Sequence, residues 1–173
     1  MVRVETRQGD HLANCRSAHD VMRAVIDTNA WLDWLVFEDP AIHALRDAVL
    51  DGRLQPVASE RLRAELADVL RRAPLLAQAC AARSRRGLPP EPPPLDGLLL
   101  RFDALCMRAP DAIHCGLACS DPDDQFWLDL AVEQRASWLI SKDRALLKLD
   151  RQAMKRFGLR ISTPQAFRIP DAD

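Results

Sequence analysis

The sequence predicts an α/β fold built around a central, mainly parallel sheet. Short apolar segments alternate with amphipathic helical segments along the chain, which is typical of strands and helices in such a fold. The chain has 173 residues, of which 48% are hydrophobic and 28% charged, so we expect one soluble globular domain.

Apolar periodicity and capping residues place the elements in the first half of the chain. An apolar strand ends at Asp27, and Pro56 favours an edge position for the second strand. The pair Asp39-Pro40 stops the first helix, and Ser59 can cap the helix that follows the second strand. The expected elements are a strand over 24–26, a helix around 31–35, a helix over 40–50, a strand over 54–58, a helix over 59–70 and a helix over 75–83.

The second half opens with a proline-rich loop near residues 85–97, which carries five prolines between positions 89 and 94. It reads as an insertion within one domain. Asp121 and Pro122 suit the N-cap and the first position of a later helix. The expected elements are a helix over 95–105, a weak strand over 113–118, a helix over 121–134, a strand over 137–141, a short helix over 143–149, a strand over 159–162 and a helical turn that starts at Pro164.

The domain is predicted to cover residues 22–170. Residues 1–21 are polar and aperiodic, so we expect an N-terminal extension that is disordered or precedes the true start at Met22. No apolar run approaches the ~18 residues of a membrane span, which predicts a cytoplasmic protein without a membrane partner. Five cysteines without a CxxC pair indicate free thiols.

The charges are balanced overall, with 24 basic and 25 acidic residues and a net charge of −1. This excludes a basic surface over the whole molecule, but it leaves room for a local one. The acids comprise 19 Asp and 6 Glu, and the bases 21 Arg and 3 Lys. Asp favours caps, loops and metal sites over helix interiors, so the excess of Asp calls for an explanation.

Several acids are predicted to lie at the carboxyl edge of the sheet, where open parallel sheets bind ligands. Asp27 follows the first strand, Asp143 follows the strand over 137–141, and Asp124 begins the helix over 121–134. Glu65 lies in the helix after the second strand and can lean over the same edge. Capping alone would explain Asp124 and Asp143, whereas an acid directly after a central strand is costly unless its carboxylate is satisfied.

Carboxylates that are forced together raise one another's pKa unless a cation compensates their charge. Mg²⁺ and Mn²⁺ prefer such oxygen ligands, and a metal held this way can activate water and shield a phosphodiester. No glycine-rich loop that could cradle a phosphate is present in the sequence. Acid–metal chemistry is therefore the best route to a phosphate substrate.

The stretch Ala24–Asn29, with the letters AVIDTN, resembles the opening strand and Asp-Thr-Asn motif of PIN-domain ribonucleases. The resemblance extends over about residues 22–168 and is closest to the bacterial branch regarded as toxin components of toxin–antitoxin pairs. The other segments that resemble the family, in the same order, are Ser59–Leu70 with Glu65, Asp121–Ala131, Trp138–Leu147 and Ser162–Phe167.

The resemblance implies a three-layer α/β/α sandwich with a short, mainly parallel central sheet. It also implies a Mg²⁺- or Mn²⁺-dependent endoribonuclease that hydrolyses RNA and is held inactive by a small antitoxin protein. Asn29 and Ser141 would hydrogen-bond and position the carboxylates, Thr28 would contribute more weakly, and Asp121 would support Asp124. The catalytic and metal-binding acids carried over by position are Asp27, Glu65, Asp124 and Asp143.

Two other groups of residues have more than one interpretation. Arg83, Arg85 and Arg86 stand beside the proline-rich loop, where they would either contact the RNA backbone or remain solvated. The tryptophans are expected to be anchors of the core or of a homodimer interface before they are platforms for base stacking. The four tryptophans are Trp31, Trp34, Trp127 and Trp138.

Two functional alternatives remain. The first is a catalytically silent module of the same fold that binds RNA or a protein, although it would have no need to keep the acids together. The second is a phosphoryl-transfer domain of the receiver or haloacid type. The run Asp27-Thr28-Asn29 supplies neither the acidic pair of the former nor the Asp-x-Asp of the latter, so it ranks last.

Overall fold

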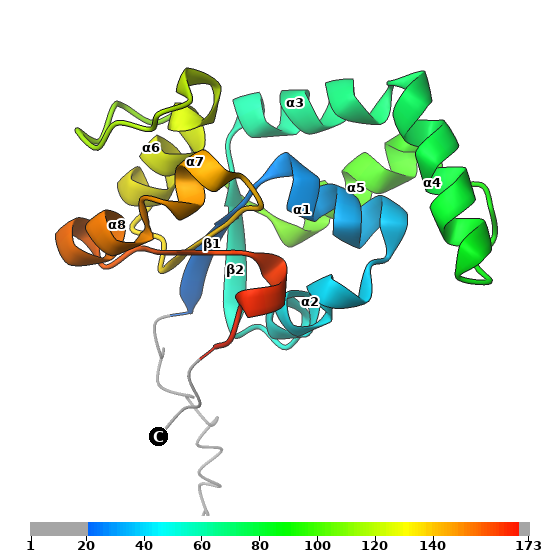
Figure 1. Cartoon of the computed structure of the whole chain (residues 1–173), viewed down its shortest axis with the longest axis horizontal. Helices are drawn as coiled ribbons and strands as arrows, with labels where there is room; N and C mark the ends of the chain where they lie inside the picture. Colours follow the sequence, from blue (N-terminus) through cyan, green and yellow to red (C-terminus); the bar gives the residue numbers. More distant parts are fainter. Residues whose placement is uncertain (1–20, 170–173) are drawn as a thin grey trace, which may run out of the picture.

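The computed structural model describes residues 21–169, and within them the chain forms five strands and eight α-helices (Figure 1). The strands are β1 Met22–Ile26, β2 Leu54–Ala58, β3 Met107–Arg108, β4 Trp138–Ile140 and β5 Arg160–Ser162. The helices are α1 Thr28–Leu32, α2 His43–Leu50, α3 Glu60–Leu70, α4 Ala73–Arg85, α5 Leu95–Leu105, α6 Gln125–Glu133, α7 Arg144–Leu147 and α8 Asp150–Phe157. Shorter helical turns cover Asp33–Phe37, Pro40–Ile42, Pro122–Asp124 and Pro164–Ala166. The expected extension lies, apart from residue 21, outside the described residues.

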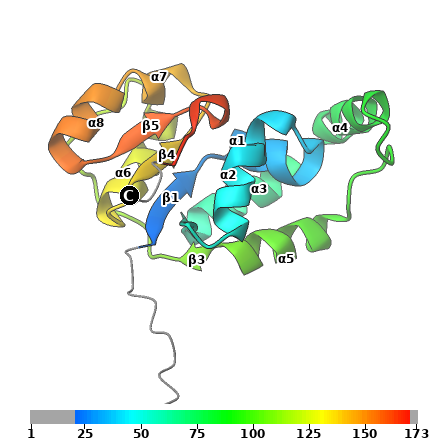
Figure 2. The ribbon, with the colours of Figure 1, turned by 90° about the horizontal axis from the view of Figure 1, so that it is seen from below.

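The strands form one parallel sheet in the order β3-β2-β1-β4-β5. From β1 the chain moves outward through β2 to β3, then crosses back to β4 and continues to β5. Because crossovers between parallel strands are right-handed, these two directions place their helices on opposite faces. Figure 2 shows α1 and α2 on one side of the sheet and α6 and α8 on the other. The predicted three-layer α/β fold with a parallel sheet is confirmed.

Two predicted features of the sheet are wrong. Strand β2 is not at the edge, because β3 pairs with its last two residues, Val57 and Ala58. Pro56 precedes that paired stretch, so its missing N–H costs no hydrogen bond there. The weak strand expected over 113–118 is an irregular segment instead, and its Cys115 N–H donates to the Asp129 carboxylate of α6 at 2.9 Å.

The tryptophans belong to the core. Trp31 and Trp34 are buried and stack with ring centroids 5.2 Å apart, and Trp127 is buried on α6. Trp138 packs edge-on against Phe167, with centroids 4.9 Å apart. Their burial is accounted for within one chain.

Two further sequence predictions, free cysteines and the absence of a membrane-spanning helix, concern residues 21–169 here. The described cysteines are all free thiols, each half-buried, at positions 80, 106, 115 and 119. In the same part of the chain, no helix combines the length and apolarity that crossing a membrane requires.

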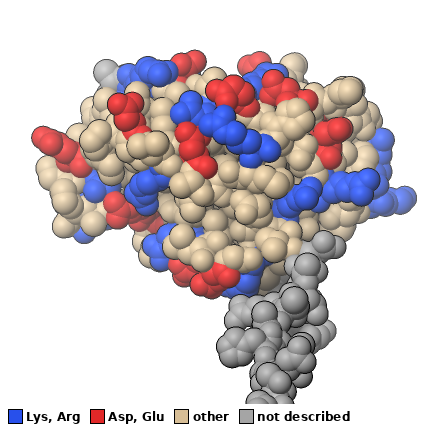
Figure 3. Space-filling model, turned by 180° about the vertical axis from the view of Figure 1, so that it is seen from behind, with Lys and Arg blue, Asp and Glu red and all other residues tan. Residues whose placement is uncertain are grey.

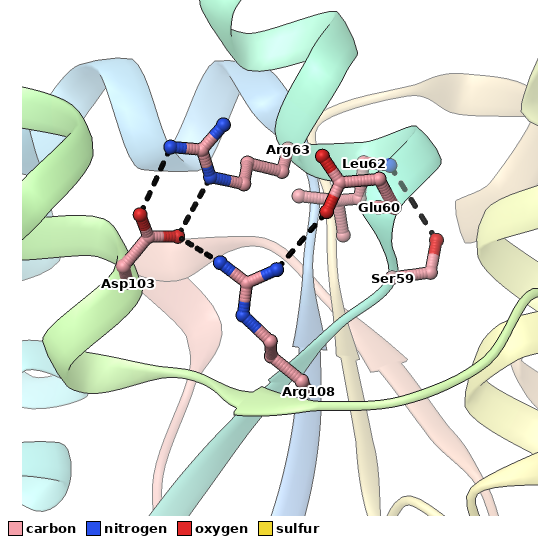
Figure 4. A network of polar contacts seen from close by, with 6 residues as sticks. All are labelled: Ser59, Glu60, Leu62, Arg63, Asp103 and Arg108. Atoms are coloured by element: carbon pink, nitrogen blue, oxygen red, sulfur yellow. Dashed lines mark hydrogen bonds and ion pairs between the residues drawn. The ribbon is translucent and has the colours of Figure 1, made fainter.

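A charged network attaches α5 to the rest of the domain (Figure 4). Arg63 of α3 donates two hydrogen bonds to Asp103 of α5, at 2.8 and 3.0 Å. Arg108 of β3 contacts Asp103 at 3.4 Å and Glu60 at 3.0 Å. Each arginine is therefore matched by an acid, and the network serves to join three elements.

Arg83 ties the end of α4 to the body of the protein. Its side chain is only 5% exposed, and its Nη1 donates to the Val36 carbonyl at 3.0 Å and to Glu38 Oε1 at 2.7 Å. Its Nε donates to the carbonyl of Pro89 at 2.8 Å, which fixes the proline-rich loop. The structure argues against the expected contact of Arg83 with RNA, because the side chain is buried and its Nε and Nη1 already bind groups of the protein.

The other two arginines of this group differ from each other. Arg86 donates to the Phe37 carbonyl at 2.6 Å and to Asp39 Oδ2 at 3.3 Å, so it also serves to hold the loop. Arg85 is exposed. Figure 1 shows this end of α4 at the far side of the molecule from α7.

Replacing Arg83 by Met should lower the free energy of unfolding by about 1.5–3 kcal/mol, because carbonyls and a carboxylate lose a charged donor. The matched control Arg85→Met changes an exposed neighbour and should stay within about 0.5 kcal/mol of wild type. Urea unfolding followed by circular dichroism measures both. Equal stability of the two variants would show that the buried guanidinium does not hold the loop.

Candidate functional site

The strand order reverses between β1 and β4, and open α/β sheets bind ligands at the carboxyl ends of the strands at such a switch point. Ile26 pairs with Ile140 at the end of the two strands, and the Asp27 N–H donates to the Ile140 carbonyl at 2.9 Å. Asp27 therefore leaves β1 beside the segment Ser141–Asp143 that leaves β4. Two of the predicted acids meet because their strands are neighbours in the sheet.

The Asp27 carboxylate is buried and satisfied by backbone groups from both strand ends. Oδ1 accepts the Ala30 N–H at 2.8 Å and so caps α1, and Oδ2 accepts the Lys142 N–H at 3.2 Å. The Ser141 hydroxyl also hydrogen-bonds this carboxylate. Burial nevertheless raises the pKa of Asp27. These contacts explain how an acid is tolerated directly after a central strand.

Asp143 is held by the turn that follows β4. Its N–H donates to the Ser141 hydroxyl oxygen at 2.9 Å, and its Oδ1 accepts the Ala145 N–H at 2.5 Å to cap α7. Ser141 is fully buried and contacts both Asp27 and Asp143. The predicted positioning role of Ser141 corresponds to these contacts.

Asp124 reaches the site from the helical turn Pro122–Asp124 that leads into α6. Asp121 caps this turn by accepting the Asp123 N–H at 3.0 Å. Burial raises the pKa of Asp124 to about 7, together with the charge of Asp143 and a hydrogen bond between the two side chains. The charges of Asp121 and Asp27 act in the same direction. Near neutral pH, part of the Asp124 population therefore keeps its proton and can donate a hydrogen bond to Asp143.

Glu65 joins the site through Thr28 instead of through the other acids. The Thr28 hydroxyl donates to Glu65 Oε1 at 2.7 Å, linking α1 to α3 directly beside Asp27. Asn29, expected to position a carboxylate, is exposed and makes no side-chain hydrogen bond within residues 21–169. Thr28 therefore does more, and Asn29 less, than the sequence predicts.

The structure contains an ion pair near the site that the sequence analysis did not predict. The Lys142 ammonium contacts the Asp33 carboxylate, whose side chain is 11% exposed. Burial raises the pKa of Asp33 while Lys142 opposes that rise, and the Asp33 charge also acts on Asp27. The sequence feature that could have indicated this pair is Asp33 itself, an acid within the apolar run from Trp31 to Val36.

Cys119 also borders the acids. Its N–H donates to Gln125 Oε1 at 2.7 Å, which fixes the segment before the Asp121 turn. Burial raises the pKa of its thiol, and the charges of Asp124, Asp143 and Asp121 add to the rise. Nothing in the spacing of the cysteines could have indicated this position.

The donor set has the chemistry of a divalent-cation site. In the arrangement found within residues 21–169, no three Asp, Glu, His or Cys side chains converge closely enough to hold a metal ion. Asp27, Asp124 and Asp143 nevertheless supply carboxylate oxygens that hard cations prefer, and their mutual repulsion is what a cation relieves. The residues therefore provide the right type of ligand atom for such an ion, once Asp124 has released its proton.

The raised pKa of Asp124 makes the stability of the metal-free protein depend on pH. Since the folded-state pKa is about 7 against 3.8 in the unfolded chain, this group stabilises the fold fully below about pH 4. That contribution is lost as the pH rises through about 7. Unfolding free energies of wild type and Asp124→Asn, measured with a chelator present, should therefore diverge in favour of the variant between these values.

The matched control for this measurement is Asp123→Asn, an exposed acid in the same turn. Its difference from wild type should not change over the same range. A flat pH profile for the difference between wild type and Asp124→Asn would contradict the raised pKa of Asp124.

Comparison with known proteins agrees with the geometry of this site. No curated protein sequence matches the chain. Residues 23–145 match the PIN domain, a stretch that begins in β1 and ends just after Asp143. PIN domains are generally nucleases that use divalent metal ions. Because the match covers more than half of the sequence, the chain belongs to the PIN-domain family.

Proposed function

We propose that the protein is a Mg²⁺- or Mn²⁺-dependent endoribonuclease that hydrolyses RNA phosphodiester bonds. The observation that carries this proposal is that Asp27 and Asp143 leave neighbouring strand ends at the switch point of the sheet, while Asp124, with its pKa raised to about 7, hydrogen-bonds Asp143. Carboxylates close to one another repel and destabilise the fold, and a bound cation would relieve that repulsion. Membership of a family of nucleases supports the same conclusion.

The residues divide the work of such a site. Asp27 and Asp124 would bind the ion directly, while Glu65 and Asp143 would bind it directly or through water and help to orient the nucleophile. A divalent ion there supplies activation of water and shielding of the phosphodiester charge. Ser141 keeps Asp27 and Asp143 in register, as its contacts with both indicate.

The positive charge of Lys142 and the hydroxyl of Thr28 complete this arrangement. Lys142 offsets the negative charge of Asp33, which would otherwise add to the repulsion at Asp27. Thr28 fixes one oxygen of Glu65 by a hydrogen bond of 2.7 Å. Both residues act on the acids of the site.

The biological role proposed for this activity is that of the toxin in a toxin–antitoxin pair, acting in the cytoplasm and held inactive by a small antitoxin protein. The order of motifs from Asp27 to Phe167 supports this role. A short gene directly upstream that encodes a DNA-binding protein would be expected. Growth arrest on expression, relieved by co-expression of that gene, tests the pairing.

Replacing Asp27 by Asn should abolish metal-dependent cleavage of RNA while the fold is retained. Asn is as good an N-cap as Asp, so the hydrogen bond to the Ala30 N–H can persist, whereas the negative charge is lost. Gel assays with a labelled RNA measure cleavage, and circular dichroism checks the fold. Asp123→Asn is the control and should cleave like wild type; unchanged cleavage by Asp27→Asn would sink the assignment.

Mn²⁺ should bind more tightly as the pH rises through about 7, because Asp124 must lose its proton to become a ligand. Calorimetry in buffers of different ionisation enthalpy measures both the affinity and the protons released. Asp124→Asn should weaken binding and remove the proton release. If wild type gives no Mn²⁺ heat and Asp124→Asn changes nothing, the alternative of a catalytically silent binding module is preferred.

A further inference from the structure

Four exposed bases follow one another along α7 and α8, and we call them the basic row. They stand four, three and four residues apart, the spacing that keeps side chains on one side of a helix. The two junction residues, Lys148 and Leu149, have right-handed backbone angles and form a turn in which the Leu149 N–H donates to the Leu146 carbonyl at 2.9 Å. The members of the basic row are Arg144, Lys148, Arg151 and Lys155.

The opposite side of the same helices faces the core. Leu146 of α7 and Ala153 of α8 are fully buried, and both lie about half a turn from the basic row. An amphipathic helix normally has mixed charges on its solvent side. The basic row contains no acid, which sets it apart from α3, where Glu60, Arg61 and Asp68 are all exposed.

Acids do not neutralise the basic row. None of its four members forms an ion pair with any residue in 21–169, whereas bases elsewhere are matched, as in Arg46–Asp47 and Arg53–Asp51. The two acids of the same segment are engaged in other ways. Asp143 caps α7, and Asp150 accepts the Ile161 N–H at 2.7 Å and pairs with Arg160.

Stability and composition do not account for the basic row. Like charges four residues apart destabilise a helix, as do positive charges in its first turn, where Arg144 lies. Lys148 at the C-cap of α7 and Lys155 in the last turn of α8 lie at helix ends that favour a base, but this effect does not account for the whole basic row. The arginine-rich composition is no explanation either, because the basic row holds two of the three lysines in the chain.

The basic row begins at the acid site. Arg144 follows Asp143 directly, and Figure 1 shows α8 continuing from α7 to the edge of the molecule. Figure 3 shows the molecule from behind, and over most of that face Lys and Arg side chains stand beside Asp and Glu side chains.

We propose that the basic row binds the phosphate backbone of single-stranded RNA and leads it to the acids at the end of β4. This inference rests on the proposed nuclease function and names where its substrate lies. A row of bases beside acids solves an electrostatic problem, because the acids alone would repel the polyanion that they are to cleave. Flexible lysines and arginines suit contacts with phosphates that carry no base specificity.

The test compares two double variants of the full chain, each of which removes two positive charges. Arg151→Gln/Lys155→Gln alters the end of the basic row away from Asp143. Arg46→Gln/Arg53→Gln is the matched control, because it removes two bases that are paired with acids, of which Arg46 is half-buried and Arg53 exposed. Fluorescence anisotropy measures the affinity for a fluorescein-labelled oligouridylate in chelator, from about 50 to 200 mM salt.

The row variant should bind the oligouridylate more weakly, and its slope of log K against log salt should fall by about 1.4, since each contact with a single strand contributes about 0.7. The control should keep the wild-type slope. An unchanged slope in the row variant, or a wild-type protein that does not bind the oligouridylate, would overturn the proposal.

Metal-dependent cleavage by wild type is measured in parallel, so that the two proposals fail separately. If wild type cleaves RNA but the row variant keeps the wild-type slope of log K against log salt, the basic row does not bind RNA, while the nuclease function is supported. A reduced slope without cleavage supports the basic row as an RNA-binding surface and removes the nuclease function. Circular dichroism of both double variants confirms that the helices persist, and Gln is chosen because it is a good helix former.

Discussion

The Asp27 carboxylate joins the carboxyl ends of the two central strands, and the geometry of the acid site depends on this link. One oxygen accepts an N–H from the first turn of α1, and the other accepts the Lys142 N–H after β4. The same group therefore starts a helix and orients the turn that presents Asp143. Its burial sets its electrostatics too, because a desolvated carboxylate makes the site sensitive to every further charge nearby.

The parts of the site that could be predicted from the sequence are those with a local cause. An apolar strand followed by Asp27, and the caps at Asp121 and Asp143, are visible in short stretches of sequence. The pair of Asp33 and Lys142 was not predicted, because it depends on β1 and β4 being neighbours in a sheet whose order reverses between them. That order is a property of the whole chain.

The errors in the predicted fold have physical reasons as well. Helix α8 was not predicted, because its core-facing side chains Leu149, Ala153 and Phe157 are few and stand in an otherwise largely polar segment. The segment over 109–121 lacks a strand because α6 side chains, such as Asp129, satisfy its backbone N–H groups in place of a neighbouring strand. Arg83 looks like a surface base beside a loop, yet its partners Val36 and Glu38 lie far away in the sequence.

The two outer strands of the sheet are very short, since β3 has two residues and β5 has three. An exposed strand edge is a template on which another chain can add a strand, and short edges offer little backbone for such pairing. β-Augmentation is one of the common ways in which proteins recognise extended peptides, and this sheet is poorly suited to it. A protein partner of this domain would therefore have to recognise its helices and loops, where side chains decide the specificity.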